Sequence, residues 1–109
     1  MAKAKDFQIG INLPEDIYEL ILIAAANEGK NCSDFVNDEL ANFLTNTEGK
    51  PLLLFPFLPS NARNRRVGIY LDEDTHELLY KALEKEKLPM VKIVEKAVYK
   101  KLLNCNKKL

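Results

Sequence analysis

Two short stretches of the chain alternate between apolar and polar side chains. Because successive side chains of a strand point to opposite faces, each stretch predicts a β-strand with one buried and one displayed face. The buried positions are aliphatic: Ile9, Ile11 and Leu13 in residues 7–13, and Val67, Ile69 and Leu71 in residues 65–71. The displayed positions are Gln8, Gly10 and Asn12 in the first strand, and Arg66, Gly68 and Tyr70 in the second.

Each strand is followed by two amphipathic segments with the spacing of a helix. After the first strand, a helix is predicted over about residues 14–27, and Asn31 or Ser33 caps a second helix. After the second strand, Asp72 caps one helix and Pro89 lies where another begins. The order strand, helix, helix therefore occurs twice.

The two halves also align as an internal repeat without a gap. A shift of 58 residues superimposes eleven identical residues, which indicates that one unit is built twice. The identities pair Gly10 with Gly68, Ile11 with Ile69, Leu13 with Leu71, Glu15 with Glu73, Asp16 with Asp74, Glu19 with Glu77, Leu20 with Leu78, Ala24 with Ala82, Glu28 with Glu86, Val36 with Val94, and Leu44 with Leu102.

A single unit of about forty residues is too small to bury its own apolar faces. Two units can do so if their strands pair antiparallel and the four helices pack beneath. We therefore predict a mainly α fold with a short two-stranded antiparallel ribbon, in which two fused units form an intramolecular pseudo-dimer. The predicted segments are an arm (1–6), a first unit (7–45), a linker (46–64), a second unit (65–104) and a tail (105–109).

The linker is unusually apolar for a connection between units. Its prolines exclude a helix and a central strand, and we expect it to lie extended on protein surface. A second apolar stripe of the first helix, Tyr18, Leu22 and Ala25, is the predicted partner surface. The linker side chains expected to be mostly buried, within the chain or between two copies of it, are Leu52, Leu53, Leu54, Phe55 and Phe57.

Composition and the absence of known motifs argue against a membrane protein, a secreted protein and an enzyme. The chain is 47% hydrophobic, which suits a packed core, and its apolar runs are too short to span a membrane. No signal peptide is recognised at the N-terminus, so we expect a cytoplasmic protein. Cys32, Cys105 and His76 do not form a metal set, and neither a nucleophile–base pair nor a phosphate loop is present, so we expect neither an enzyme nor a cofactor.

The zero net charge of the chain conceals a difference between its halves. Residues 1–49 contain three lysines and nine acidic side chains, a net charge of −6, whereas residues 50–109 contain thirteen basic and seven acidic side chains, a net charge of +6. The second half is therefore the one suited to a polyanionic partner.

The repeated strand, acidic helix start and two helices resemble the ribbon-helix-helix family, the class of the Arc and methionine repressors. The resemblance covers residues 7–44 and 65–102. Family members pair one strand from each of two chains, whereas both strands belong to one chain here, as in tandem members from conjugative plasmids and archaeal viruses. The resemblance implies a regulator of transcription, most simply a repressor, that binds double-stranded DNA through the major groove.

The family's residue roles carry over onto matching positions. Base-reading residues would be Gln8, Asn12, Arg66 and Tyr70, because Arg pairs with guanine and Gln or Asn with adenine. Gly10 and Gly68 would allow close approach to DNA, or else mark a bulge or twist point. Phosphate contacts would come from the start of each second helix and from nearby cations, unless these are ordinary helix starts. The candidates are Lys5, Lys30, Cys32, Ser33, Arg65, Met90, Val91 and Lys92.

Two other functions fit the same sequence. An architectural, relaxosome or partition accessory protein would use the same DNA contacts for another purpose. A protein-interaction module of the antitoxin type would instead bind a partner through the apolar linker, and the acidic first half supports this alternative.

Overall fold

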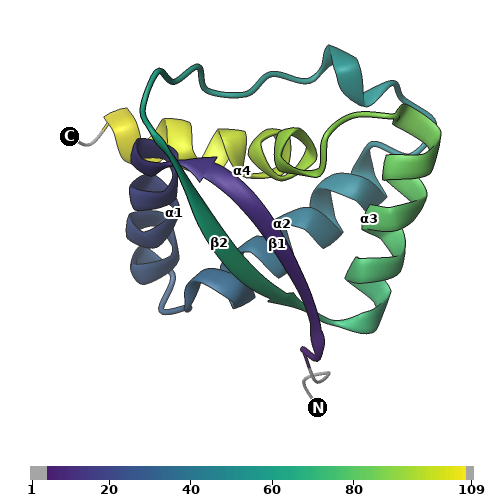
Figure 1. Ribbon diagram of the computed structural model, residues 1–109, viewed down its shortest axis with the longest axis horizontal. Helices are drawn as coiled ribbons and strands as arrows, with labels where there is room; N and C mark the ends of the chain where they lie inside the picture. The colour runs from purple at the N-terminus through teal and green to yellow at the C-terminus, as the bar shows by residue number, and fades with distance from the viewer. Residues whose placement is uncertain (1–4, 108–109) are drawn as a thin grey trace.

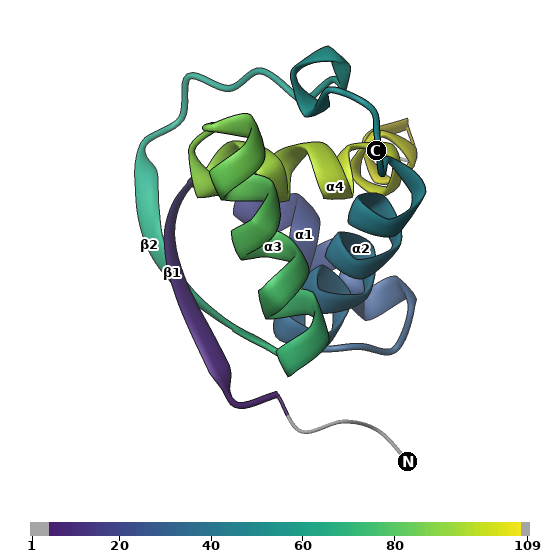
Figure 2. The ribbon, with the colours of Figure 1, turned by 90° about the vertical axis from the view of Figure 1, so that its right-hand side faces the viewer.

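A computed structural model describes residues 5–107, which fold into a two-stranded ribbon and four α-helices (Figure 1). The ribbon covers one side of the helices, as the view in Figure 2 shows. The elements follow the order β1 (Phe7–Pro14), α1 (Glu15–Asn27), α2 (Cys32–Asn46), the 3₁₀ turn η1 (Leu52–Leu54), β2 (Asn64–Leu71), α3 (Glu73–Glu86) and α4 (Met90–Lys107).

The two predicted strands pair with each other. They run antiparallel over their whole length, with Gly10 opposite Gly68 at the middle of the ribbon. The aliphatic side chains of both strands face the helices and are almost fully buried, as the alternation predicts. They join a core whose largest fully buried side chains are Phe35, Leu13, Ile21, Leu40, Ile69, Leu71, Leu79, Ile93 and Leu102.

The helix ends follow the local signals of the sequence. Asn31 caps α2 by accepting a hydrogen bond from the Asp34 amide, and Asp72 caps α3 by accepting one from the Thr75 amide, both at 2.8 Å. Gly29 after α1 and Lys87 after α3 occupy equivalent positions of the repeat, and both have left-handed backbones, with φ of 69° and 56°. A left-handed residue therefore ends both helices, once as glycine and once as lysine.

The end of the chain differs from the prediction of a tail that begins at residue 105. Helix α4 continues to Lys107, and Cys105 is buried in the core. The Asn27 side-chain amide donates to Cys105 Sγ at 3.8 Å. Burial of the Cys105 thiol against α1 stabilises the last turn of α4, so α4 continues past residue 105. Of the predicted arm, residues 1–4 lie outside the described residues.

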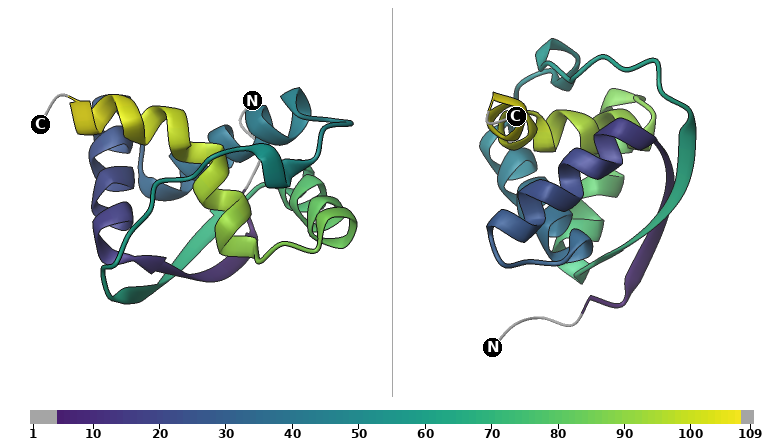
Figure 3. Two further views of the ribbon diagram at one scale, coloured as in Figure 1. Left: turned by 90° about the horizontal axis from the view of Figure 1, so that it is seen from above. Right: turned by 90° about the vertical axis from the view of Figure 1, so that its left-hand side faces the viewer.

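The linker lies on a different surface from the predicted one. It crosses α2 and α4 instead of the outer stripe of α1, and Figure 3 shows it passing over α4. The Phe55 ring meets the Phe43 ring edge to face at 5.3 Å between centroids, and Lys96 Nζ donates to the Phe55 carbonyl oxygen. The stripe of α1 predicted to contact the linker is not fully available, because its Ala25 is buried in the core.

The linker's apolar side chains are also less buried than predicted. Leu52 is buried and its amide donates to Glu86 Oε1 at 3.0 Å, whereas Leu53 and Leu54 are 70% and 77% exposed. These residues form η1, a turn of 3₁₀ helix that begins directly after Pro51, where no helix is predicted. A tight turn cannot direct all three leucines inward, so one packs and two point to solvent.

Candidate nucleic-acid interface

The outer face of the ribbon gathers the six displayed residues that the sequence predicts. All six are exposed, and the register sets Gln8 opposite Tyr70, Gly10 opposite Gly68 and Asn12 opposite Arg66. Alternation along each strand produces this face, because the aliphatic neighbours occupy the inner side. Each end of the ribbon thus presents one pair of polar side chains, and the glycines lie between them.

The space above the two glycines is occupied by side chains of the facing strand. A Cβ added to Gly10 would lie 2.6 Å from Nη2 of Arg66, and one added to Gly68 would lie 2.6 Å from Nε2 of Gln8. Neither glycine has a positive φ, so the backbone does not require glycine at these positions. The missing Cβ atoms instead leave room for the Arg66 guanidinium and the end of the Gln8 side chain over the middle of the ribbon. The sequence shows the glycines but not this contact.

The two ends of the ribbon differ in chemistry. At one end Arg65 lies over the Tyr18 ring of α1, 5.0 Å from the ring centroid, with Arg63 and Arg66 nearby in the chain. This basic end also borders the acidic first turn of α1, whose Glu15 amide donates to the Arg63 carbonyl oxygen at 2.9 Å. Its arginines are the side chains that can attract a polyanion.

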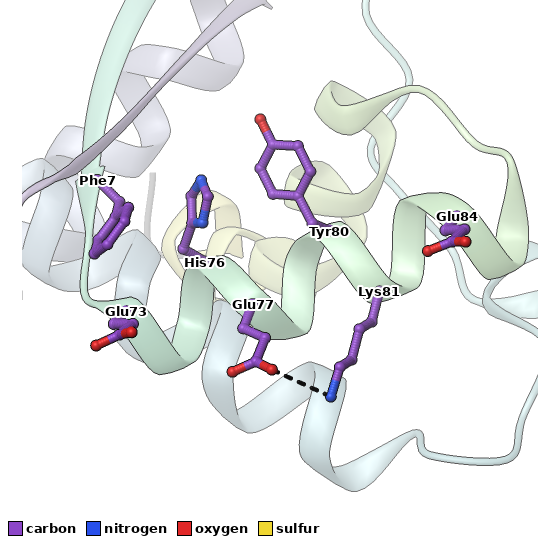
Figure 4. A pocket seen from close by; sticks show the side chains of 7 residues that line it. All are labelled: Phe7, Glu73, His76, Glu77, Tyr80, Lys81 and Glu84. Atoms are coloured by element: carbon purple, nitrogen blue, oxygen red, sulfur yellow. Dashed lines mark ion pairs between the residues drawn. The ribbon is translucent and has the colours of Figure 1, made fainter.

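The opposite end carries an aromatic stack. The Phe7 ring lies against His76 at 4.8 Å between centroids, and His76 lies against Tyr80 at 4.5 Å (Figure 4). His76 is therefore half-buried between two rings. The three rings line a surface hollow beside α3. The hollow is also lined by charged side chains of that helix, namely Glu73, Glu77, Lys81 and Glu84. These carboxylates would repel phosphate, and the arginines of the chain gather at the opposite end of the ribbon.

The predicted phosphate contacts of the first unit lie at the start of α2. Ser33 Oγ accepts a hydrogen bond from the Tyr70 amide at 2.9 Å, which brings this helix start against β2. Cys32 is half-buried, and burial raises the pKa of its thiol. Lys5 forms an ion pair with Asp34 at 3.0 Å, and its hydrogen bond to that carboxylate raises the lysine pKa.

Two further predicted phosphate contacts already have other partners. Lys30 Nζ lies 2.8 Å from Asp38 and 3.3 Å from Glu28, and its hydrogen bond to Asp38 raises its pKa. Lys92 Nζ lies 4.0 Å from the centroid of Phe57 and 3.6 Å from a Glu95 carboxylate oxygen. The structure places Met90 and Val91 at the first turn of α4.

A polar clamp that the sequence analysis does not identify holds α2 to the end of β2. Asn37 is buried, its Oδ1 accepts from the Asp72 amide at 3.0 Å, and its Nδ2 donates to Asp72 Oδ2 at 3.1 Å. The sequence signal that could have revealed the clamp is the polar Asn37 side chain, which lies between Val36 and Leu40 on the apolar side of a helix. The clamp fixes the α3 cap and the exit of β2 together.

The other half of the molecule lacks this clamp. The repeat places Glu95 where Asn37 stands and Pro14 where Asp72 stands, and proline has no amide to donate. Glu95 is buried, and burial raises the pKa of its carboxyl, which Lys92 only partly offsets. The two junctions that support the ribbon are thus chemically different.

Among residues 5–107, no group of three or more His, Cys, Asp or Glu side chains is arranged to hold a metal ion. None of the described helices combines the length and apolar character needed to cross a membrane. No protein-family model matches the chain, and comparisons with curated proteins and with solved structures find no match.

Proposed function

We propose that the protein is a sequence-specific DNA-binding regulator of transcription, acting as a repressor, and that its ribbon enters the major groove. The observation that carries this proposal is the exposed outer face of the ribbon, where Gln8, Asn12, Arg66 and Tyr70 surround two opposed glycines. A two-stranded ribbon fits the major groove, where each base pair presents a distinct pattern of donors and acceptors.

The side chains on this face have suitable chemistry for reading base edges. Arg66 can donate two hydrogen bonds to guanine, and Gln8 and Asn12 can pair with adenine. Tyr70 adds a hydroxyl and a ring that can contact a thymine methyl group. Arg65 at the basic end supplies the sequence-independent attraction to phosphate.

We further propose that residues 7–45 and 65–104 act as two fused ribbon-helix-helix units in an intramolecular pseudo-dimer. The repeated order of strand and two helices supports this, as do the antiparallel strands and the equivalent left-handed turns at Gly29 and Lys87. An architectural or partition role would use the same contacts, so the regulated event is tested separately from DNA binding.

One observation favours a second candidate, a protein-interaction module. Leu53 and Leu54 are exposed next to each other on η1, where an apolar partner could cover them. Leu53→Ser/Leu54→Ser should then abolish capture of that partner while leaving DNA binding unchanged. The ribbon proposal predicts the opposite pattern for substitutions at Gln8 and Arg66.

The deciding experiment selects duplexes from a random DNA pool and then compares variants on the selected site and on a scrambled duplex. Arg66→Ala should lose roughly 5- to 150-fold in discrimination, the range of about 1–3 kcal/mol for a bidentate base contact. Gln8→Ala should lose less DNA affinity than Arg66→Ala, because it removes no charge that attracts phosphate. Failure to enrich any sequence would overturn the proposal, and equal losses on both duplexes would reduce Arg66 to a phosphate contact.

A further inference from the structure

A hollow of about 440 Å³ lies between the second half of α2, the middle of α4 and the linker. Figure 2 shows the ribbon along one side of the molecule and the ends of α2 and α4 at the other. The hollow is therefore separate from the proposed DNA-reading face. Its volume is in the range of sites that bind small molecules.

The hollow is strongly basic. Four lysines line it, namely Lys50, Lys96, Lys100 and Lys101, whereas Glu39 is its one acidic residue. Lys101 is already engaged, since its Nζ lies 2.6 Å from Glu28 and 3.7 Å from Glu39. Lys50 and Lys100 are exposed and enter no ion pair within residues 5–107.

Lys96 provides a second, independent indication of an anion. Its side chain is buried, with 6% of the residue exposed, and its ammonium group donates to the Phe55 carbonyl oxygen. Burial, and then repulsion from Lys92, lower the pKa of Lys96, and Glu95 offsets this only in part. The ammonium group also lies 5.3 Å from the centroid of the Phe57 ring but forms no ion pair within the described chain, so an anion that binds beside it would stabilise it.

The remaining wall of the hollow is aromatic and amide-bearing. Phe43 and Phe55 meet edge to face at 5.3 Å between centroids, and both are half-buried. Asn42 lines the same wall and offers both a donor and an acceptor. The described lining contains no arginine. Lysine ammonium groups nevertheless bind phosphate in many proteins, where each acts as a point charge.

We propose that this hollow binds a small phosphorylated molecule with a flat apolar body, of the nucleotide class. Lys50, Lys96 and Lys100 hold its phosphate groups, and the faces of Phe43 and Phe55 contact its ring. The ligand then bridges α2, α4 and the linker, adding to the Phe43–Phe55 ring contact, the bond from Lys96 to Phe55 and the ion pair of Lys101 with Glu39.

The test uses the full chain without DNA and titrates it with ATP as the probe, followed by calorimetry. Tripolyphosphate and adenosine serve as the two halves of the probe. ATP should bind more tightly than either, and Lys50→Gln/Lys100→Gln should weaken it by ~10-fold or more, because two charge-assisted contacts are lost. Lys85→Gln, an exposed lysine of α3 outside the hollow, is the matched control and should leave ATP affinity unchanged.

Three results would overturn this proposal. They are absence of ATP binding, equal loss in the control variant, and equal affinity for tripolyphosphate and ATP. A fourth uses duplex DNA as competitor: if Lys50→Gln/Lys100→Gln weakens DNA binding as much as ATP binding, the hollow belongs to a DNA-binding surface instead. Because ATP binding is measured without DNA, failure here is distinct from failure of the proposed DNA-binding function.

Discussion

At the scale of single residues, the glycines at the middle of the ribbon connect its stability to the proposed reading of DNA bases. Gly10→Ala would place a Cβ against the far end of the Arg66 side chain, and this end can move aside. The variant should be as stable as the parent or more so by up to about 1 kcal/mol, because glycine weakens a strand. It should nevertheless bind the selected DNA site less well.

Gly68→Ala is the matched variant for this prediction. It displaces the uncharged Gln8, so its DNA binding should fall less than that of Gly10→Ala. Urea denaturation measures the stability of both variants, and a binding titration measures their DNA affinity. Two destabilised variants, or two variants with unchanged DNA affinity, would contradict the role assigned to the glycines.

Lys87 holds a backbone conformation that suits glycine. Its φ of 56° follows the last residue of α3, and its amide donates to the Leu83 carbonyl oxygen at 2.9 Å. Lys87→Gly should raise the free energy of unfolding by about 1 kcal/mol, the approximate cost of a left-handed non-glycine residue. Gly29→Ala, at the equivalent turn, should lower it by a similar amount. Thermal denaturation of both variants checks the pair, and a loss in Lys87→Gly would refute it.

The buried Glu95 should make the folding stability of the protein depend on pH. Its folded-state pKa is raised by burial, with Lys92 and Lys96 opposing and Asp16 reinforcing the shift, so ionisation is less favourable in the folded state. Glu95→Gln should therefore be more stable than the parent at pH 7. The advantage of the variant should be absent below pH 4.5, the ordinary pKa of a glutamate carboxyl. It should grow as the pH rises from 4.5 through the raised pKa of the folded state.

Denaturation curves over this pH range test the prediction. The exposed Glu84→Gln is the control and should change stability by less than about 0.5 kcal/mol at any pH. A Glu95→Gln variant that is less stable than the parent at pH 7 would show that the ion pair with Lys92 outweighs burial.

At the scale of elements, the Asn37 clamp determines how firmly α2 supports the ribbon. Asn37→Ala removes both bonds to Asp72 and should cost about 1–3 kcal/mol, since it leaves a partly buried amide without this acceptor. Asn42→Ala, on the exposed side of the same helix, should change the stability by less than about 0.5 kcal/mol. Equal effects in chemical denaturation would contradict the clamp.

Alternation and helical spacing are enough to predict the strands and helices, because each depends on neighbours within a few residues. They also predict which ribbon side chains are displayed. The linker is different, since Leu52, Leu53 and Leu54 have the same hydrophobicity and only the turn at η1 decides that one is buried. A sequence pattern contains no information about that choice.

The candidate site was predictable to the same limited extent. Strand parity identifies the four proposed base readers, but it does not show that Arg66 lies across Gly10. Nor does it show that Lys5 and Lys30 form ion pairs with Asp34 and Asp38, because those contacts depend on how the helices pack. Contacts between elements are therefore the part that required the structure.

At the scale of the whole molecule, the two ends of the ribbon differ in their side chains. One end is basic and carries Arg65 on Tyr18, while the other carries the stack of Phe7, His76 and Tyr80 beside carboxylates. A site selected by one bound chain should therefore have two unlike halves. Sequencing of selected duplexes tests this, and a perfectly palindromic minimal site bound by a single chain would contradict it.

The pairing of β1 with β2 also affects how the chain folds. Phe7 pairs with Leu71, so the ribbon closes across most of the chain, and such long-range contacts form slowly. During synthesis β1 emerges first and exposes Ile9 and Ile11 along an open strand edge until β2 arrives. A neighbouring nascent chain can supply its own β2 to that edge. The interval between synthesis of the two strands is thus the period in which chains can exchange strands and become interlocked dimers.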